Sequence, residues 1–218
     1  MFNPTDESTP GYYGHKHTAL LLLGYQNYFV ESFGGPGARA ALQVATQMQI
    51  WANNRGIRVI HCIVHIGREP FPTSKNAAQT ATLMAYMGEG NGKRADEPAE
   101  MFDYWRTGND VVFPITPGYL SAFECIELDD WLRDRGIESL ILAGLTTSGH
   151  VLRTAHAGQD RKYVVTVIKD GCADPIEGVH DMMVEKVLPN GAYVVTAAEF
   201  RDGYAHIWNP GATNPRAR

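Results

Sequence analysis

Short runs of apolar residues alternate along the chain with longer segments in which apolar positions recur every three or four residues. The apolar runs are typical of strands covered on both faces, and they lie at residues 18–23, 57–66, 140–143, 163–168 and 192–196. The segments of helical period predict helices, at residues 38–54, 77–87, 121–135 and 175–188. Strands that alternate with helices form βαβ units, so the pattern predicts an α/β domain with a parallel sheet and helices on both faces.

This domain is expected to span residues 18–200. Within it, a further short strand is predicted at residues 110–113, ended by Pro114 and Pro117, and a solvent loop at residues 88–98. Residues 1–17 are polar and predict a partly ordered terminus, or an arm over the surface, the pocket or a neighbouring subunit. Residues 201–218 predict an extended C-terminal tail.

Composition and charge exclude several kinds of partner. The chain of 218 residues is 44% hydrophobic and 20% charged, as in ordinary soluble globular proteins. A net charge of −5 disfavours nucleic acid or an anionic membrane as a partner. No apolar run approaches the ~20 residues that span a bilayer, and the first residues do not have the pattern of a signal peptide. We therefore expect a cytoplasmic protein that binds neither nucleic acid nor membrane.

Neither a metal nor a cofactor is expected from the sequence. Cys62, Cys125 and Cys172 are far apart and form no CxxC pair, so buried, reduced thiols are expected. His61 and His65 lie four residues apart on one predicted strand, but no carboxylate stands at a matching spacing to complete a metal site. The glycine-rich segment at residues 33–37 lacks the GxGxxG order of a dinucleotide site.

Residues 140–158 form the segment with the most distinct chemistry. An apolar run leads through Gly144 to small and polar residues and then to a segment of helical period. This pattern predicts a buried strand, a tight turn and a helix N-terminus, where backbone N–H groups bind anions and oxyanions. His150 lies on the turn. Ligands of parallel α/β sheets bind beyond the carboxyl ends of the strands, so we expect the site at residues 24–28, 65–69, 113–123 and 146–150.

Several ordered motifs between residues 18 and 200 resemble the isochorismatase-like hydrolases, also called the cysteine hydrolase family. The family's first strand runs into D-x-Q-N-D-F, and residues 21–29 are L-L-L-G-Y-Q-N-Y-F. Its G-x-x-T-S-G-C-V turn matches residues 144–151, which are G-L-T-T-S-G-H-V. Further matches are S-A-F at 121–123, D-x-C-A-D-P at 170–175 and H…E-K-V at 180–187. The resemblance implies a three-layer Rossmann-like isochorismatase-like fold and a homodimer or homotetramer.

The same resemblance identifies three positions at which this chain departs from the family. Family members use an aspartate after the first strand as base, a lysine before S-A-F, and a cysteine on the turn as nucleophile. Here the aspartate position is Gly24, the lysine position is Pro117 (or Pro114 if the loop is longer), and the cysteine position is His150. Amide hydrolysis by a thiolate and ordinary isochorismatase activity are therefore both disfavoured.

The candidate catalytic residues are His150, Tyr25 and His65. A histidine on this turn is suited to acid–base catalysis near neutral pH, or it is only a polar side chain bonded to a backbone carbonyl. A tyrosine hydroxyl can donate to a substrate oxygen, or the ring serves as an aromatic wall. The residues expected to bind substrate are Gly24, Gln26, Tyr28, Pro117, Phe123, Thr146, Thr147, Ser148 and Gly149, and Gln26 also suits a purely structural role.

Two functions remain open at this point. The first is a divergent enzyme that acts on a small apolar or aromatic metabolite by elimination, isomerisation, cyclisation or non-thiol hydrolysis. The second is a catalytically inactive family member that binds a ligand or a partner subunit. An open pocket beside His150 favours the enzyme, whereas a pocket filled by tyrosines or by the proline-containing loop favours the binding protein.

Overall fold

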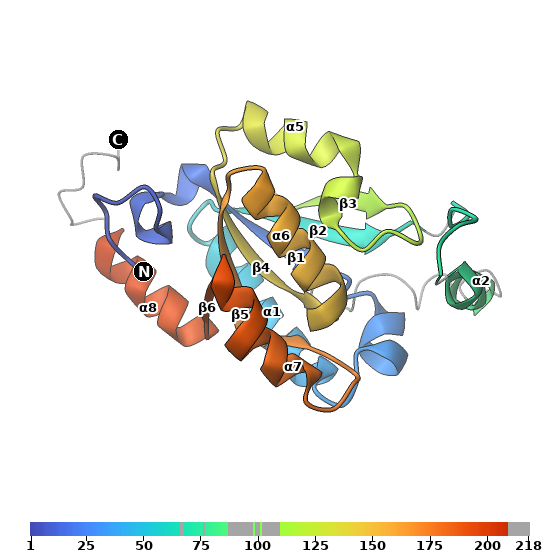
Figure 1. Cartoon of the computed structure of the whole chain (residues 1–218). Coiled ribbons are helices and arrows are strands. Elements are labelled where there is room, and N and C mark those ends of the chain that lie inside the picture. Colours follow the sequence, from blue (N-terminus) through green and yellow to red (C-terminus); the bar gives the residue numbers. More distant parts are fainter. Residues whose placement is uncertain (66–67, 76, 87–97, 99–100, 102–109, 209–218) are drawn as a thin grey trace.

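A computed structural model describes residues 1–65, 68–75, 77–86, 98, 101 and 110–208. Within these residues, six parallel strands form one sheet in the order β3-β2-β1-β4-β5-β6 (Figure 1). The strands are β1 (Thr18–Leu23), β2 (Arg58–Val64), β3 (Val111–Ile115), β4 (Ser139–Leu145), β5 (Val164–Ala173) and β6 (Tyr193–Val195). The parallel α/β sheet expected from the sequence is confirmed.

Helices cover both faces of the sheet, as Figure 1 shows. Alternate residues of β1 enter different cores: Leu20 and Leu22 pack with α1 and α8, and Leu21 and Leu23 pack with α5 and α6. All six residues of β1 are buried, because a central parallel strand has no face toward water. The helices are α1 (Ala38–Asn53), α2 (Ala77–Tyr86), α5 (Ile126–Asp134), α6 (Leu152–Asp160), α7 (Val179–Met182) and α8 (Ala197–Ile207). No helix in the described part of the chain is long and apolar enough to cross a membrane.

Some element boundaries differ from the sequence prediction. Strand β3 does not end at Pro114 but continues to Ile115, because β3 is an edge strand, where a missing N–H is tolerated. The predicted helix at 121–135 begins instead as a single 3-10 turn, η5 (Ala122–Glu124), before α5. The helical segment after β5 begins at Val179 rather than Pro175 and continues through η7 (Met183–Val187).

The two ends of the chain pack against each other. The ring of Phe2 lies edge-on to Phe200 of α8 at 5.4 Å, and the indole N–H of Trp208 donates to the Gly11 carbonyl (3.2 Å). The N-terminal arm therefore covers α8 of its own chain. The prediction of an extended tail from residue 201 was wrong, because α8 continues to Ile207; residues 209–218 and most of the predicted 88–98 loop lie outside the described residues.

A buried polar network joins α1 to the strands β2 and β3. The carboxylate of Asp110 accepts from the Nε2 of His61 (2.9 Å), from Gln49 (2.6 Å) and from Asn53 (2.8 Å). The side chains of His61 and Asp110 are both fully buried. No cluster of three or more metal-binding side chains occurs in the described parts of the chain. His61 thus has a carboxylate partner that its sequence neighbours do not supply.

Replacing Asp110 is expected to destabilise the fold strongly. In Asp110→Ala, the buried side chains of His61 and Gln49 and the half-buried Asn53 lose the carboxylate to which they donate. Breaking a buried charged contact of this kind costs about 3–5 kcal/mol of unfolding free energy. Urea unfolding followed by circular dichroism measures the loss. Asp134→Ala is the control, because Asp134 is exposed at the end of α5 and its loss should change the free energy by less than about 0.5 kcal/mol. Equal effects of the two variants would contradict the assigned role.

Candidate active site

The neighbouring strands β1 and β4 end at the same level, since Leu23 pairs with Gly144. Strand order reverses between them, which is where parallel α/β sheets bind ligands. After β1 the chain turns at Gly24, whose φ of +67° lies in the region that favours glycine. After β4 it passes Thr146 and enters the helical turn η6 (Thr147–Val151). The two segments after these strands therefore face each other at one edge of the sheet.

His150 lies on η6 between these two segments. Its side chain is almost wholly buried, with 4% of the residue exposed. Its ring lies edge-on to that of Phe29, and the two ring centroids are 5.6 Å apart. Nδ1 lies 2.8 Å from the Leu145 carbonyl. Because a carbonyl oxygen can only accept, Nδ1 carries the proton in this contact, and the neutral ring then has an unprotonated Nε2. Burial lowers the pKa of His150, and the bond to Leu145 opposes this shift.

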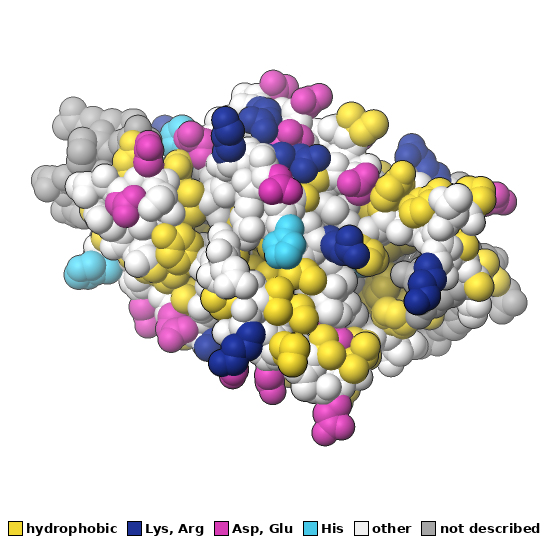
Figure 2. Space-filling model, viewed as in Figure 1, with side chains coloured by type: hydrophobic (Ala, Val, Ile, Leu, Met, Phe, Trp, Pro, Cys, Tyr) yellow, Lys and Arg dark blue, Asp and Glu magenta, His cyan; other side chains and the backbone are white. Residues whose placement is uncertain are grey.

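A cavity of about 90 Å³ opens beside His150. No described residue of its lining is Asp, Glu, Lys or Arg, so the polar groups are hydroxyls, backbone and the imidazole. A hollow with apolar side chains is visible beside α2 on the face drawn in Figure 2. This lining suits a small, uncharged, largely apolar or aromatic molecule. The described lining residues are Tyr28, Phe29, Phe33, Val64, Thr80, Gly118, Tyr119, Leu120, Thr146 and His150.

The backbone N–H groups of the turn after β4 are less available to a ligand than the sequence predicts. The N–H and the hydroxyl of Ser148 both donate to the Asp174 carboxylate, at 2.8 and 2.6 Å. The N–H groups of Gly149 and Val151 donate to the Thr146 carbonyl, each at 3.2 Å. These amides are occupied within the protein, so the expected anion cradle is not available at Ser148 or Gly149. Thr146 is the residue of this turn that, with His150, lines the cavity.

Three residues in the segment after Gly24, Tyr25, Gln26 and Tyr28, have different surroundings. Tyr25 is fully buried and its hydroxyl donates to the Gly171 carbonyl, a position that argues against proton transfer to a substrate. Gln26 accepts from the Val64 N–H (2.8 Å) and donates to the Val64 carbonyl (3.3 Å), which fixes the loop after β1 to the end of β2. Tyr28 lines the cavity. Of these predicted residues, the structure brings only Tyr28 to the cavity.

Three other expected residues lie beside the cavity rather than in its described lining. His65 follows β2, is half-buried, and donates its N–H to the Ile115 carbonyl (2.8 Å). Pro117 is buried and adjoins Gly118, which does line the cavity. Thr147 is fully buried, and its hydroxyl is hydrogen-bonded to Nδ1 of His180 (2.9 Å). Each of the three is the sequence neighbour of a lining residue, namely Val64, Gly118 or Thr146.

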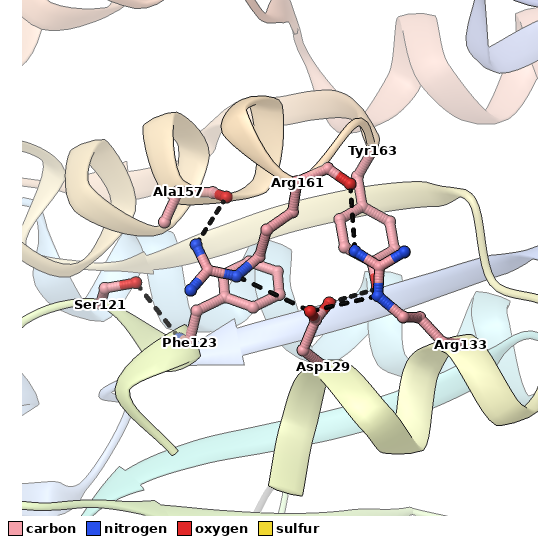
Figure 3. A network of polar contacts seen from close by, with 7 residues as sticks. All are labelled: Ser121, Phe123, Asp129, Arg133, Ala157, Arg161 and Tyr163. Carbon is pink, nitrogen blue, oxygen red and sulfur yellow. Dashed lines mark hydrogen bonds and ion pairs between the residues drawn. The ribbon is translucent and has the colours of Figure 1, made fainter. Parts of the chain in front are cut away.

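Phe123 lies on the other side of the sheet, which corrects its expected role in substrate binding. Its ring stacks on Tyr163 at 5.7 Å, and the guanidinium of Arg161 lies 4.8 Å from the ring centroid (Figure 3). In the same network, the Tyr163 hydroxyl and the Arg133 side chain donate to Asp129, at 2.7 and 3.1 Å. The S-A-F motif therefore serves to pack α5 against α6.

Residues 18–199 match the family model described as the Isochorismatase domain. The chain belongs to the isochorismatase family. It is 37% identical over 211 residues to the nicotinamidase of Escherichia coli, covering 84% of this chain and 97% of that protein. It is 23% identical over 197 residues to the maleamate amidohydrolase of Pseudomonas putida, covering 89% and 90%. The crystal structure of a cysteine hydrolase from Pseudomonas syringae superposes with a TM-score of 0.71 at 19% identity, covering 90% and 96%.

In this isochorismatase-family chain, several described cavity residues were not named as binding residues from the sequence. Phe29 and Phe33 come from one helical turn, η3 (Phe29–Phe33), so their spacing places them near each other. The rings of Tyr119 and Phe71 come from different loops and are tilted against each other, with their centroids 4.8 Å apart. The sequence gives no signal for such a pairing. The lining residues that the sequence reasoning missed are Phe29, Phe33, Val64 and Thr80; Gly118, Tyr119 and Leu120 were not named individually but lie within the expected range 113–123.

None of the three cysteines is among the described residues that line the cavity. Cys62, Cys125 and Cys172 are free and buried, as expected from the sequence. Burial raises the pKa of Cys125 to about 11 and that of Cys172 to about 12. A thiol with so high a pKa is almost wholly protonated at neutral pH and is a poor nucleophile.

Burial of His150 predicts a pH-dependent loss of stability. In the unfolded chain a histidine takes up a proton near pH 6.5, whereas the lowered pKa keeps folded His150 neutral below that value. The unfolded state thus binds more protons as pH falls through 6.5, which favours unfolding by up to roughly 1.4 kcal/mol at pH 5.5. Urea unfolding at pH 7.5 and 5.5 tests this, with His150→Gln as the control. The loss between the two pH values should be smaller in His150→Gln; equal losses would show that folded His150 protonates like an unfolded histidine.

Proposed function

We propose that this isochorismatase-family protein is an enzyme that acts by acid–base chemistry on a small, uncharged, largely apolar or aromatic metabolite, with His150 as the proton-transfer group. The observation that carries the proposal is the position of the imidazole. Nδ1 is held by the Leu145 carbonyl (2.8 Å), while the residue lines the cavity. A neutral histidine held in this way presents an unprotonated Nε2, as a general base must.

The proposed reaction uses the imidazole of His150 and the hydroxyl-bearing residues that line the cavity. Nε2 takes a proton from the substrate, and the Leu145 carbonyl stabilises the positive charge that forms on the ring. Tyr28, Tyr119, Thr80 and Thr146 line the cavity, and hydroxyl groups can donate to a substrate oxygen on which negative charge develops. Return of the proton to another atom of the substrate gives isomerisation, and its transfer to a group that departs gives elimination. Attack of the deprotonated atom on a multiple bond of the same molecule, which then takes up the proton, gives ring closure. If the proton comes from water, the hydroxide attacks an acyl carbon and the proton passes to the leaving group, which gives hydrolysis without a thiol.

The second candidate is a catalytically inactive family member that binds a ligand or a partner subunit. It is favoured by the same contact that supports the enzyme, because a neutral histidine bonded to a backbone carbonyl is also an ordinary way to satisfy a buried imidazole. The open cavity is consistent with a ligand in both cases. Only turnover separates the two.

We also propose that the protein is a cytoplasmic homodimer or homotetramer, as the family resemblance implies. Light scattering coupled to size-exclusion chromatography gives the number of subunits.

The protein is expected not to hydrolyse nicotinamide or maleamate, the amides in the names of its two relatives. The reason is that, by the family resemblance, Gly24, Pro117 (or Pro114) and His150 occupy the positions of the base, the lysine and the thiol. Ammonia release from both amides measures the activity, before and after treatment with iodoacetamide. Ammonia release that iodoacetamide abolishes would show that one of the buried cysteines acts as a nucleophile after all.

The direct test of the proposed function begins with mass spectrometry of small molecules that co-purify with the protein. With the identified compound or its close analogues as substrate, His150→Ala should lower kcat/KM by about 10²–10⁴-fold, the usual contribution of a general base. Cys125→Ser is the matched control, because Cys125 packs in the core on the α5–α6 side of the sheet, and its activity should be unchanged. A bound compound that wild-type protein never turns over would favour the inactive binding protein, and unchanged turnover in His150→Ala would rule out this mechanism.

A further inference from the structure

Gly24 and His150 are adjacent in space although they belong to different segments of the chain. A β-carbon placed on Gly24 would lie 2.7 Å from Nδ1 and 3.2 Å from Cε1 of the imidazole. It would also lie 2.7 Å from the Leu145 carbonyl oxygen, which is the acceptor for Nδ1. Any side chain at position 24 would therefore meet both partners of this hydrogen bond.

The contact is too close to be absorbed by small adjustments. Carbon atoms in contact with other heavy atoms prefer about 3.5–4.0 Å, so 2.7 Å requires a shift of the ring or of the backbone. The ring has little room to move, because it is buried and packs edge-on to Phe29 at 5.6 Å. The available movement is rotation of the imidazole away from Leu145 toward the cavity.

We infer that Gly24 is a positioning residue for His150: the missing side chain leaves the space in which the imidazole lies against the Leu145 carbonyl, and this contact holds the ring in the Nδ1–H tautomer. The inference deepens the proposed function, on which it rests, because the tautomer decides which nitrogen can take a proton from a substrate. It also means that positions 24 and 150 are sterically coupled. The imidazole of this chain excludes a side chain at the position where the family resemblance places an aspartate.

The test needs a control glycine whose replacement by alanine causes the same backbone strain but no collision with a side chain or carbonyl. Gly56 provides it, since its φ of +68° nearly equals the +67° of Gly24. A β-carbon on Gly56 would meet only a histidine side-chain carbon at 4.0 Å. Gly24→Ala and Gly56→Ala therefore carry the same left-handed strain, and only Gly24→Ala adds the collision with His150 and Leu145.

The decisive readout is the tautomer of His150, measured by ¹H–¹⁵N correlation spectra of protein labelled at its histidines. The chain has eight histidines, so the spectrum of His150→Gln identifies the signals of His150. Wild type and Gly56→Ala should show a protonated Nδ1 and an unprotonated Nε2 at pH 7.5. In Gly24→Ala the ratio of the two tautomers should shift by roughly fivefold or more toward Nε2–H, because the bond to Leu145 is lost. An unchanged tautomer in Gly24→Ala would overturn the inference.

Stability gives a second, independent measure if Gly24→Ala folds poorly. The double variant Gly24→Ala/His150→Ala removes the imidazole and frees the Leu145 carbonyl to move. Gly24→Ala should therefore lower the urea midpoint less when it is introduced into His150→Ala than when it is introduced into the wild-type protein. Equal falls, or a double variant that fails to fold while His150→Ala folds, would show that position 24 rejects a side chain regardless of His150. Neither measurement uses turnover, so unchanged activity in His150→Ala would reject the proposed function without touching this inference.

Discussion

The hydrogen bond from His150 to the Leu145 carbonyl determines most of what the site can do. It closes the turn between the end of β4 and η6, and it satisfies one nitrogen of a ring that is almost wholly buried. Without that partner, burial of the imidazole would leave a polar group unpaired, at a cost of about 1–3 kcal/mol. The bond also fixes the tautomer, and therefore which ring nitrogen carries the basic lone pair. The absence of a side chain at Gly24 is the condition for it, because a β-carbon there would lie 2.7 Å from both bonded atoms.

A backbone carbonyl is a weaker partner for an imidazolium than the carboxylate of a Ser-His-Asp triad. It orients the ring and accepts a hydrogen bond from Nδ1–H, but it adds no negative charge. Burial therefore dominates, and the pKa of His150 stays below its ordinary value. Such a base is fully available at neutral pH yet has a modest affinity for protons. In the proposed reaction, such a base suits substrates whose proton is already acidified, for example next to a carbonyl group. No charged side chain among the described lining residues competes with His150 for the proton.

The sequence predicted the scaffold much better than the cavity. Continuous apolar runs and helical periods are local signals, so β1, α1 and the end of β4 at the turn were placed correctly. The carbonyl of Gly171 as the partner of Tyr25, and Asp110 as the partner of His61, come from segments distant in sequence, and no spacing rule gives them. Phe123 was misplaced because its motif indicates a position near β3 but not the face of the sheet. The cavity wall depends on loops such as the one holding Tyr119, whose partner Phe71 was invisible in the sequence.

Several contacts that do not involve the side chain of residue 150 also hold the backbone of the turn after β4. Asp174 holds the N–H and the hydroxyl of Ser148, and the Thr146 carbonyl accepts two further amides. Residue 150 could therefore change from cysteine without disturbing the backbone, provided that a histidine had space for its ring. With an aspartate at position 24 that space is filled, whereas with glycine it is open. If the chain descends from a protein with the usual catalytic residues, the aspartate must have been lost before the histidine arrived, or together with it, since the reverse order passes through a collision of two buried side chains.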